Sequence, residues 1–127
     1  WNVDLKTVNP EAYKTIFGHL PSVMNTLRAI LAHGSHLEVT YLIVPKFNDS
    51  QEDLIQLANL VFELGVPVLH LSRYFPANHY VEPPTSEEIM RLAEELVSGE
   101  LRRLWEQNPD KRLTAVYLGN CSWVHDY

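Results

Sequence analysis

The sequence predicts an α/β fold built on a parallel sheet, in the form of a (βα) half-barrel. Four strand-like stretches alternate with helical stretches along the 127 residues, and strands separated by helices form right-handed βαβ units. Successive side chains of a strand face opposite sides of the sheet, and each early strand has one apolar and one largely polar side. A doubly wound sheet needs two apolar sides, so these polar sides favour a barrel-type sheet with helices on one face.

The first predicted strand, residues 2–6, carries this pattern in its shortest form. Asn2, Asp4 and Lys6 share one side of the strand, whereas Val3 and Leu5 share the other. An acid and a base one pleat apart are unusual in a parallel strand, which normally reads as a nearly continuous apolar run. The strand therefore predicts a polar cavity on one side of the sheet.

Two predicted helices follow this strand, each bounded by proline and glycine. The first begins near Pro10, in the first turn, and ends at Gly18. The second runs from about Pro21 to a stop at Gly34, since glycine is the usual residue just past a helix end.

The second and third predicted strands, residues 36–44 and 66–74, repeat the two-sided pattern. Their polar sides carry seven side chains: His36, Glu38, Thr40, Leu42, His70, Ser72 and Tyr74. A further helix is predicted between these strands. Residues 48–50 are typical of a helix cap, and Ser50 with Asp53 approximates a capping box at its start. Gly65 ends this helix.

After a loop at residues 75–84, Thr85 with Glu88 predicts a capping box that opens the next helix. A separate helical piece is expected at residues 100–107, and the last strand at residues 113–118.

Composition limits the classes of function. A chain of 127 residues is expected to form a single domain, residues 1–127, with a modest core. The net charge of −6 and the lack of a basic stripe argue against a nucleic acid partner. Neither a membrane-length apolar run nor a signal-peptide pattern occurs, and the single Cys121 rules out an internal disulfide. We therefore expect a cytoplasmic protein that is not bound to a membrane.

Short motifs follow one another along nearly the whole chain in a specific order. They are Asn2-Val3-Asp4-Leu5-Lys6, Tyr13, Gly18, His36-Leu37-Glu38-Val39-Thr40, Leu42-Ile43-Val44-Pro45, Asn48-Asp49-Ser50, His70-Leu71-Ser72-Arg73-Tyr74, Pro83-Pro84-Thr85 and Tyr117-Leu118-Gly119-Asn120. Together they resemble the C-terminal part of radical S-adenosylmethionine (SAM) enzymes, in particular relatives of the pyruvate formate-lyase-activating enzyme of the AmmeMemoRadiSam type. The resemblance implies the C-terminal part of a partial, TIM-like (βα)6 barrel.

The resemblance also implies cofactors and a substrate for a full-length parent enzyme. These are SAM, a four-iron four-sulfur cluster, and an unidentified protein or small-molecule substrate. The family's Cys-x3-Cys-x2-Cys loop, which supplies three thiolates to the cluster, has no counterpart here, so we expect the chain alone to be inactive and to retain no cofactor. Lys46 is a second departure, because relatives often place Gly after the Val-Pro pair.

By resemblance, Asp4 and Lys6 contact SAM, with the carboxylate accepting from ribose hydroxyls or an amino group and the ammonium pairing with a carboxylate. The alternative for these two residues is an internal ion pair. The resemblance extends the SAM pocket over the next two strands, to six further residues: Thr40, Leu42, Val44, His70, Ser72 and Tyr74. Core packing is the alternative for Leu42 and Val44, and a hydrogen-bonded structural role is the alternative for His70.

Two other functions remain open. A barrel lysine beside an acid also suits a Schiff-base aldolase with Lys6 as nucleophile, and the open polar face could instead serve a non-catalytic interaction module. We do not expect a zinc site, because His33, His36, His70 and His79 lack zinc-ligand spacing. A half-barrel has a free strand edge, so we expect the isolated chain to self-associate, as a dimer.

Overall fold

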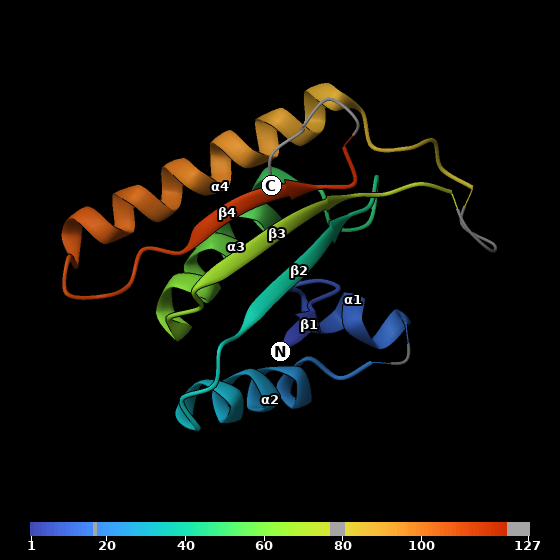
Figure 1. Ribbon diagram of the computed structural model, residues 1–127. Helices are drawn as coiled ribbons and strands as arrows, with labels where there is room; N and C mark the ends of the chain where they lie inside the picture. Colours follow the sequence, from blue (N-terminus) through green and yellow to red (C-terminus); the bar gives the residue numbers. More distant parts are fainter. Residues whose placement is uncertain (17, 77–80, 122–127) are drawn as a thin grey trace.

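The computed structural model describes residues 1–16, 18–76 and 81–121, in which four strands alternate with four helices (Figure 1). The strands are β1 (Asn2–Asp4), β2 (Glu38–Ile43), β3 (Val68–Arg73) and β4 (Ala115–Gly119). The helices are α1 (Pro10–Thr15), α2 (Leu20–Ala32), α3 (Gln51–Leu64) and α4 (Glu87–Gln107). The predicted alternation of strands and helices is confirmed.

The strands form one parallel sheet in the order β1-β2-β3-β4. Its register aligns side chains in rows across the strands. One row joins Asp4, Thr40, His70 and Tyr117. The next row toward the N-terminal ends of the strands joins Asn2, Glu38, Val68 and Ala115.

One face of this sheet, the covered face, packs against helices. Its central side chains are fully buried: Val39, Tyr41, Ile43, Leu69 and Leu71. They belong to the same core cluster as the buried residues of α2, α3 and α4, and α3 lies directly behind the strands in Figure 1. The predicted α/β fold, a parallel sheet with helices on one face, is thus confirmed.

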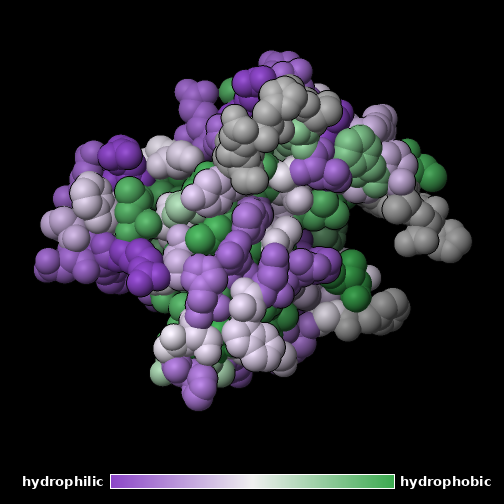
Figure 2. All heavy atoms as spheres, viewed as in Figure 1, coloured by the Kyte–Doolittle hydropathy of each residue, from purple (hydrophilic) through white to green (hydrophobic). Residues whose placement is uncertain are grey.

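The other face, called the open face below, keeps its side chains partly or fully exposed to solvent. Those of Glu38, Thr40, Leu42, His70 and Ser72 are all intermediate in exposure. In the view of Figure 2, hydrophilic residues spread across the front of the sheet, with smaller apolar patches between them. The polar sides predicted from the strand pattern therefore lie together on one surface.

Helix α3 begins and ends as predicted. The Ser50 hydroxyl accepts a hydrogen bond from the Asp53 backbone N–H at 3.0 Å, and Gly65 ends the helix with a left-handed φ of 76°. The capping residue of α4, in contrast, is Ser86 and not Thr85, because the Ser86 side chain accepts from the Ile89 N–H.

Helix α4 is continuous over 21 residues, so the prediction of two separate helical pieces was wrong. Gly99, inside the helix, costs stability relative to alanine but does not break the hydrogen-bond ladder. Strand β1 is also shorter than predicted. It ends at Asp4, and the Lys6 N–H donates instead to the Tyr13 hydroxyl at 2.9 Å.

Helix α1 ends at Thr15, before the predicted stop at Gly18. Gly18 still has a structural role, because a Cβ atom there would lie 2.5 Å from the Tyr13 ring. Only glycine lets the chain pass this close to the aromatic ring whose hydroxyl holds the end of β1.

Lys46 lies in the loop after β2 and has a φ of 65°. This left-handed conformation favours glycine, which explains why a glycine suits the position where this chain has lysine. Across the described part of the chain, none of the helices combines the length and the apolar character needed to cross a membrane.

Candidate functional site

The candidate site lies on the open face, toward the C-terminal ends of β1, β2 and β3. Binding sites of parallel α/β sheets form at these ends, where the loops that follow the strands converge. Parallel pairing places Asp4 beside Thr40 and Thr40 beside His70, so three of the predicted site residues share one row.

Asp4 and Lys6 form an ion pair at this end of β1. Their Nζ and Oδ2 atoms are 3.2 Å apart, and the side chains are 61% and 48% exposed, respectively. Surface pairs of this kind contribute little to stability. Both groups remain within reach of a ligand, although they also form the internal pair considered as the alternative from the sequence.

The residues predicted on β2 and β3 line the middle of the open face. The Thr40 hydroxyl donates to Asn2 Oδ1 at 2.9 Å, and Leu42 lies beside Ser72 in the register. Ser72 in turn lies beside Gly119, where a Cβ atom would come within 3.0 Å of the serine Oγ. Glycine at this position keeps the serine hydroxyl uncrowded.

Val44 and Tyr74 lie just beyond the ends of β2 and β3, and they differ in exposure. Val44 is half-buried. Tyr74 is 4% exposed, and its hydroxyl donates to the backbone carbonyl of Glu82 at 3.0 Å. Tyr74 is buried but is not part of the core cluster of the covered face, and its contact with SAM stays a prediction.

Two buried polar side chains fix the strand ends beneath the candidate site. Asn48 is 1% exposed; its amide donates to the carbonyls of Lys6 and Leu42 at 2.7 and 2.8 Å and accepts from the Val44 N–H at 2.8 Å. Thr85 is equally buried and donates to the Ile43 carbonyl. The sequence suggested helix capping for both positions, since polar residues before a helix give no sign of burial.

A cluster of three ionisable side chains lies on the same face, nearer the N-terminal ends of the strands. Glu38 Oε1 is 2.5 Å from His70 Nε2, and Glu38 Oε2 is 3.0 Å from His36 Nε2. The hydrogen bond to His70, and then that to His36, hold the pKa of the Glu38 carboxyl below its usual value. Sequence analysis placed Glu38 on the polar side but did not pair it with His70, because the register between β2 and β3 is not visible in the sequence.

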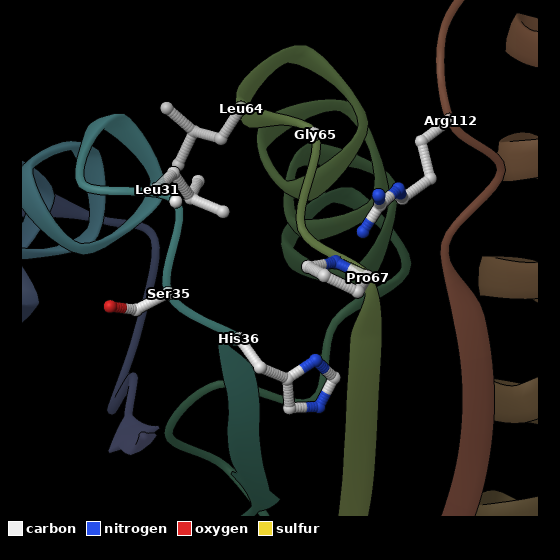
Figure 3. Close-up of a pocket in the computed structure, with 8 residues that line it drawn as sticks. Leu31, Ser35, His36, Leu64, Gly65, Pro67 and Arg112 are labelled. Atoms are coloured by element: carbon white, nitrogen blue, oxygen red, sulfur yellow. The ribbon is translucent and has the colours of Figure 1, made fainter.

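A cavity of about 500 Å³ opens at the opposite end of the sheet from the predicted site, where β2 and β3 begin (Figure 3). Leu31 and Leu64 face each other across one side of it, and the rings of His36 and Pro67 and the Arg112 side chain lie on the other. His36 therefore contributes to the cavity wall as well as to the Glu38 cluster.

The side chains of the chain do not fit an iron–sulfur cluster. Such clusters are held by several cysteine thiolates, and this chain has one cysteine. Burial raises the pKa of the Cys121 thiol, which donates to the Gly119 carbonyl at 3.3 Å. Within the described ranges, His, Cys, Asp and Glu side chains form no group of three or more that could hold a metal ion, and His79 lies outside those ranges.

The fold is shared with solved structures of a defined class. A domain of pyruvate-formate lyase-activating enzyme from Bacteroides vulgatus superposes on 94% of this chain with a TM-score of 0.72 and 12% identity, and the match covers 66% of that domain structure. Streptococcus suis SuiB superposes on 95% of this chain with a TM-score of 0.65 and 12% identity, over 27% of its own length. The expected resemblance to pyruvate formate-lyase-activating enzymes is confirmed at the level of the fold.

In sequence, the chain is 34% identical over 123 residues to the uncharacterized protein MJ0808 of Methanocaldococcus jannaschii. That alignment covers 94% of this chain and 33% of the relative, so the chain spans about a third of the length of the curated protein it matches. No family model matches the chain.

Proposed function

We propose that this chain is the C-terminal part of a radical SAM enzyme related to pyruvate formate-lyase-activating enzymes, and that its open face forms part of the SAM pocket. One observation carries the proposal. The parallel sheet has the fold found in an activating-enzyme domain. Its polar face is not covered by helices, and the carboxylate of Asp4 lies beside the ammonium of Lys6 at one end of that face. The coverage of only a third of the sequence relative supports a longer parent protein.

The chemistry of the open face matches the polar groups of SAM. SAM carries an amino group, a carboxylate and two ribose hydroxyls. The Asp4 carboxylate accepts hydrogen bonds from hydroxyl or amino donors, and the Lys6 ammonium donates to a carboxylate. The half-buried Leu42 and Val44 offer apolar surface beside them for the adenine ring.

In this proposal the open-face residues of this chain bind and orient SAM. When bound, SAM together with a reduced four-iron cluster supplies the radical chemistry. The three thiolates for that cluster come from a part of the parent protein other than these 127 residues, which contain one cysteine. The substrate, a protein or a small molecule, contacts the parent enzyme as a whole.

The environment of Lys6 favours this proposal over a Schiff-base aldolase. A lysine that attacks carbonyl groups is activated by desolvation in an apolar pocket or by a second cation. Lys6 is instead 48% exposed and lies 3.2 Å from a carboxylate oxygen. Borohydride reduction with a carbonyl substrate separates the two functions, since only an aldolase lysine forms a trapped adduct.

The proposal is tested by measuring SAM affinity in the full-length parent with Asp4→Ala and Lys6→Ala. Each change is expected to weaken binding by roughly 1–3 kcal/mol, the scale of a charge-assisted hydrogen bond. Folding stability is expected to change by less than about 1 kcal/mol, because the pair is exposed. Isothermal titration calorimetry gives the affinity, and urea denaturation gives the stability.

Helix α1 offers matched controls for this experiment. Its Lys14–Glu11 pair has an N···O distance of 3.3 Å and comparable exposure but lies away from the open face. Lys14→Ala and Glu11→Ala are expected to leave SAM affinity unchanged. If the Asp4 and Lys6 variants lose as much stability as SAM affinity, the Asp4–Lys6 pair is structural. If the control variants lose as much SAM affinity as the Asp4 and Lys6 variants, the effect is not specific to the open face.

A further inference from the structure

The Glu38 carboxylate is held between two imidazole rings on the open face. Oε1 contacts His70 Nε2 at 2.5 Å, and Oε2 contacts His36 Nε2 at 3.0 Å. The side chains of Glu38 and His70 are 34% and 30% exposed, so the pair lies at the surface of the sheet and not inside the core. Both carboxylate oxygens therefore have a ring N–H to accept from.

The strand register places Glu38 and the candidate SAM-binding strand ends on opposite sides of the row that contains His70. His70 lies in the row of Asp4 and Thr40, and Glu38 lies one row nearer the N-terminal ends of the strands. Glu38 thus reaches His70 diagonally from the next strand. Along the strands, the row of His70 therefore lies between the row of Glu38 and the strand ends where a ligand would bind.

This contact determines which nitrogen of His70 carries a proton. An ionised carboxylate only accepts hydrogen bonds, so Nε2 must be the donor and Nδ1 the acceptor of a neutral ring. The lowered pKa of the Glu38 carboxyl keeps it ionised at neutral pH. Among the residues that the structure describes, Nδ1 of His70 has no hydrogen-bond partner.

We propose that His70 is a proton-transfer residue of the open face and that Glu38 is its positioning residue. The ligand is a molecule that carries an exchangeable O–H or N–H, or an activated C–H, and that lies across β1 to β3. The inference shares with the proposed function only the assumption that ligands bind on the open face.

The proton balance needs no other reactant. A proton moves from the ligand to Nδ1 of His70, and the electron pair of the broken bond stays on the ligand. The imidazolium that forms keeps its Nε2–H on Glu38, whose negative charge stabilises it. In the reverse direction the imidazolium returns the proton to the ligand.

The other groups around His70 are compatible with this role. Tyr117 on β4 packs its ring against the imidazole, with centroids 5.8 Å apart. Just before β2, His36 contacts the second oxygen of Glu38. On β1, Asp4 belongs to the same row as His70. A purely structural pair is less well supported, because β2 and β3 are already paired over six residues by their backbones.

The first test is nitrogen-detected NMR of the histidine rings in the 127-residue chain. The proposal requires the Nε2–H tautomer as the main form of the neutral His70 ring. Glu38→Leu removes both acceptor oxygens, and it is expected to make the Nδ1–H tautomer detectable. A predominant Nδ1–H tautomer in the unmodified chain, or the same tautomer signals in folded Glu38→Leu, overturns the proposal.

The second test measures base catalysis with 5-nitrobenzisoxazole as the probe. A base that removes the ring C–H of this compound breaks its N–O bond and releases a coloured nitrophenolate. At a fixed pH the rate is expected to fall about a hundredfold in His70→Gln, the lower end of the range for general base catalysis. In Glu38→Gln the rate is expected to fall as well, because the imidazolium that forms loses the negative charge that stabilises it.

Two controls make the result specific. Glu100→Gln removes a carboxylate that is held by Arg103 on α4, away from the open face, and should change neither readout. His36→Gln removes the second partner of Glu38 and should lower the rate less than Glu38→Gln does. A wild-type rate in folded His70→Gln rejects the role of His70, and because no SAM is present, this failure is distinct from failure of the SAM pocket.

Discussion

The two faces of the sheet differ most clearly at neighbouring residues of β3. Leu71 is fully buried against the helices, whereas Ser72, the next residue, lies partly exposed on the open face. The covered face is almost entirely apolar and belongs to one core cluster. The open face holds ion pairs and hydrogen-bonded side chains that solvent reaches.

The apolar covered face and the polar open face therefore have different roles, the first in folding stability and the second in ligand binding. Burial of apolar side chains on the covered face supplies most of the folding free energy. Exposed ion pairs on the open face contribute little to it, so their arrangement is better explained by a ligand. Substitutions on the two faces should therefore affect different measurements.

The largest expected effect is on the covered face. Leu71→Ala should destabilise the chain by about 4 kcal/mol, because it removes fully buried methyl groups and leaves a cavity. Leu42→Ala, on the open face of the neighbouring strand, should cost less than about 1 kcal/mol. Urea denaturation of both variants checks the contrast, and equal losses would show that the open face is covered in solution.

The second largest loss of folding stability is expected at the strand ends, where the two faces of the sheet meet. Asn48→Ala should destabilise the chain by about 3 kcal/mol, because it leaves two partly buried carbonyls and one N–H without their partner. The control is Asn108→Ala, since that exposed amide has one hydrogen bond, to the Leu104 carbonyl. Thermal unfolding should separate the two, and a cost at Asn48 no larger than at Asn108 would refute this role.

The smallest effect, of opposite sign, is expected in the loop after β2. Lys46→Gly should stabilise the chain by roughly 0.5 kcal/mol, because relief of the left-handed backbone at φ 65° exceeds the added flexibility of glycine in the unfolded chain. Lys46 also contacts Glu82 with its Nζ at 3.2 Å, but this lysine is 77% exposed. A destabilised Lys46→Gly would mean that the ion pair outweighs the backbone strain.

The sequence was sufficient to predict the fold, because alternation of side chains along a strand is a local property. The pattern of Asn2, Asp4 and Lys6 and its repetition at Glu38 and Thr40 correctly indicated one polar and one apolar face. Ser50 and Gly65, which act through contacts within a few residues, were also identified correctly.

The pairing of side chains between strands could not be predicted. The Glu38–His70 contact joins residues 32 positions apart and depends on the register of β2 and β3. Asn48 and Thr85 look like capping residues in the sequence, and their burial follows only from the packing of distant strand ends above them. The burial of Tyr74 involves a hydrogen bond to Glu82 in the following loop, which alternation along the strand does not reveal.

The most direct test of ligand binding on the open face is hydrogen–deuterium exchange of the full-length parent with and without SAM. Saturating SAM is expected to slow exchange by about tenfold or more at the C-terminal ends of β1, β2 and β3, within residues 4–7, 40–44 and 70–74. These segments surround the exposed Asp4–Lys6 pair. Unchanged exchange there, or protection confined to the cavity lined by His36 and Arg112 at the other end of the sheet, would contradict the account.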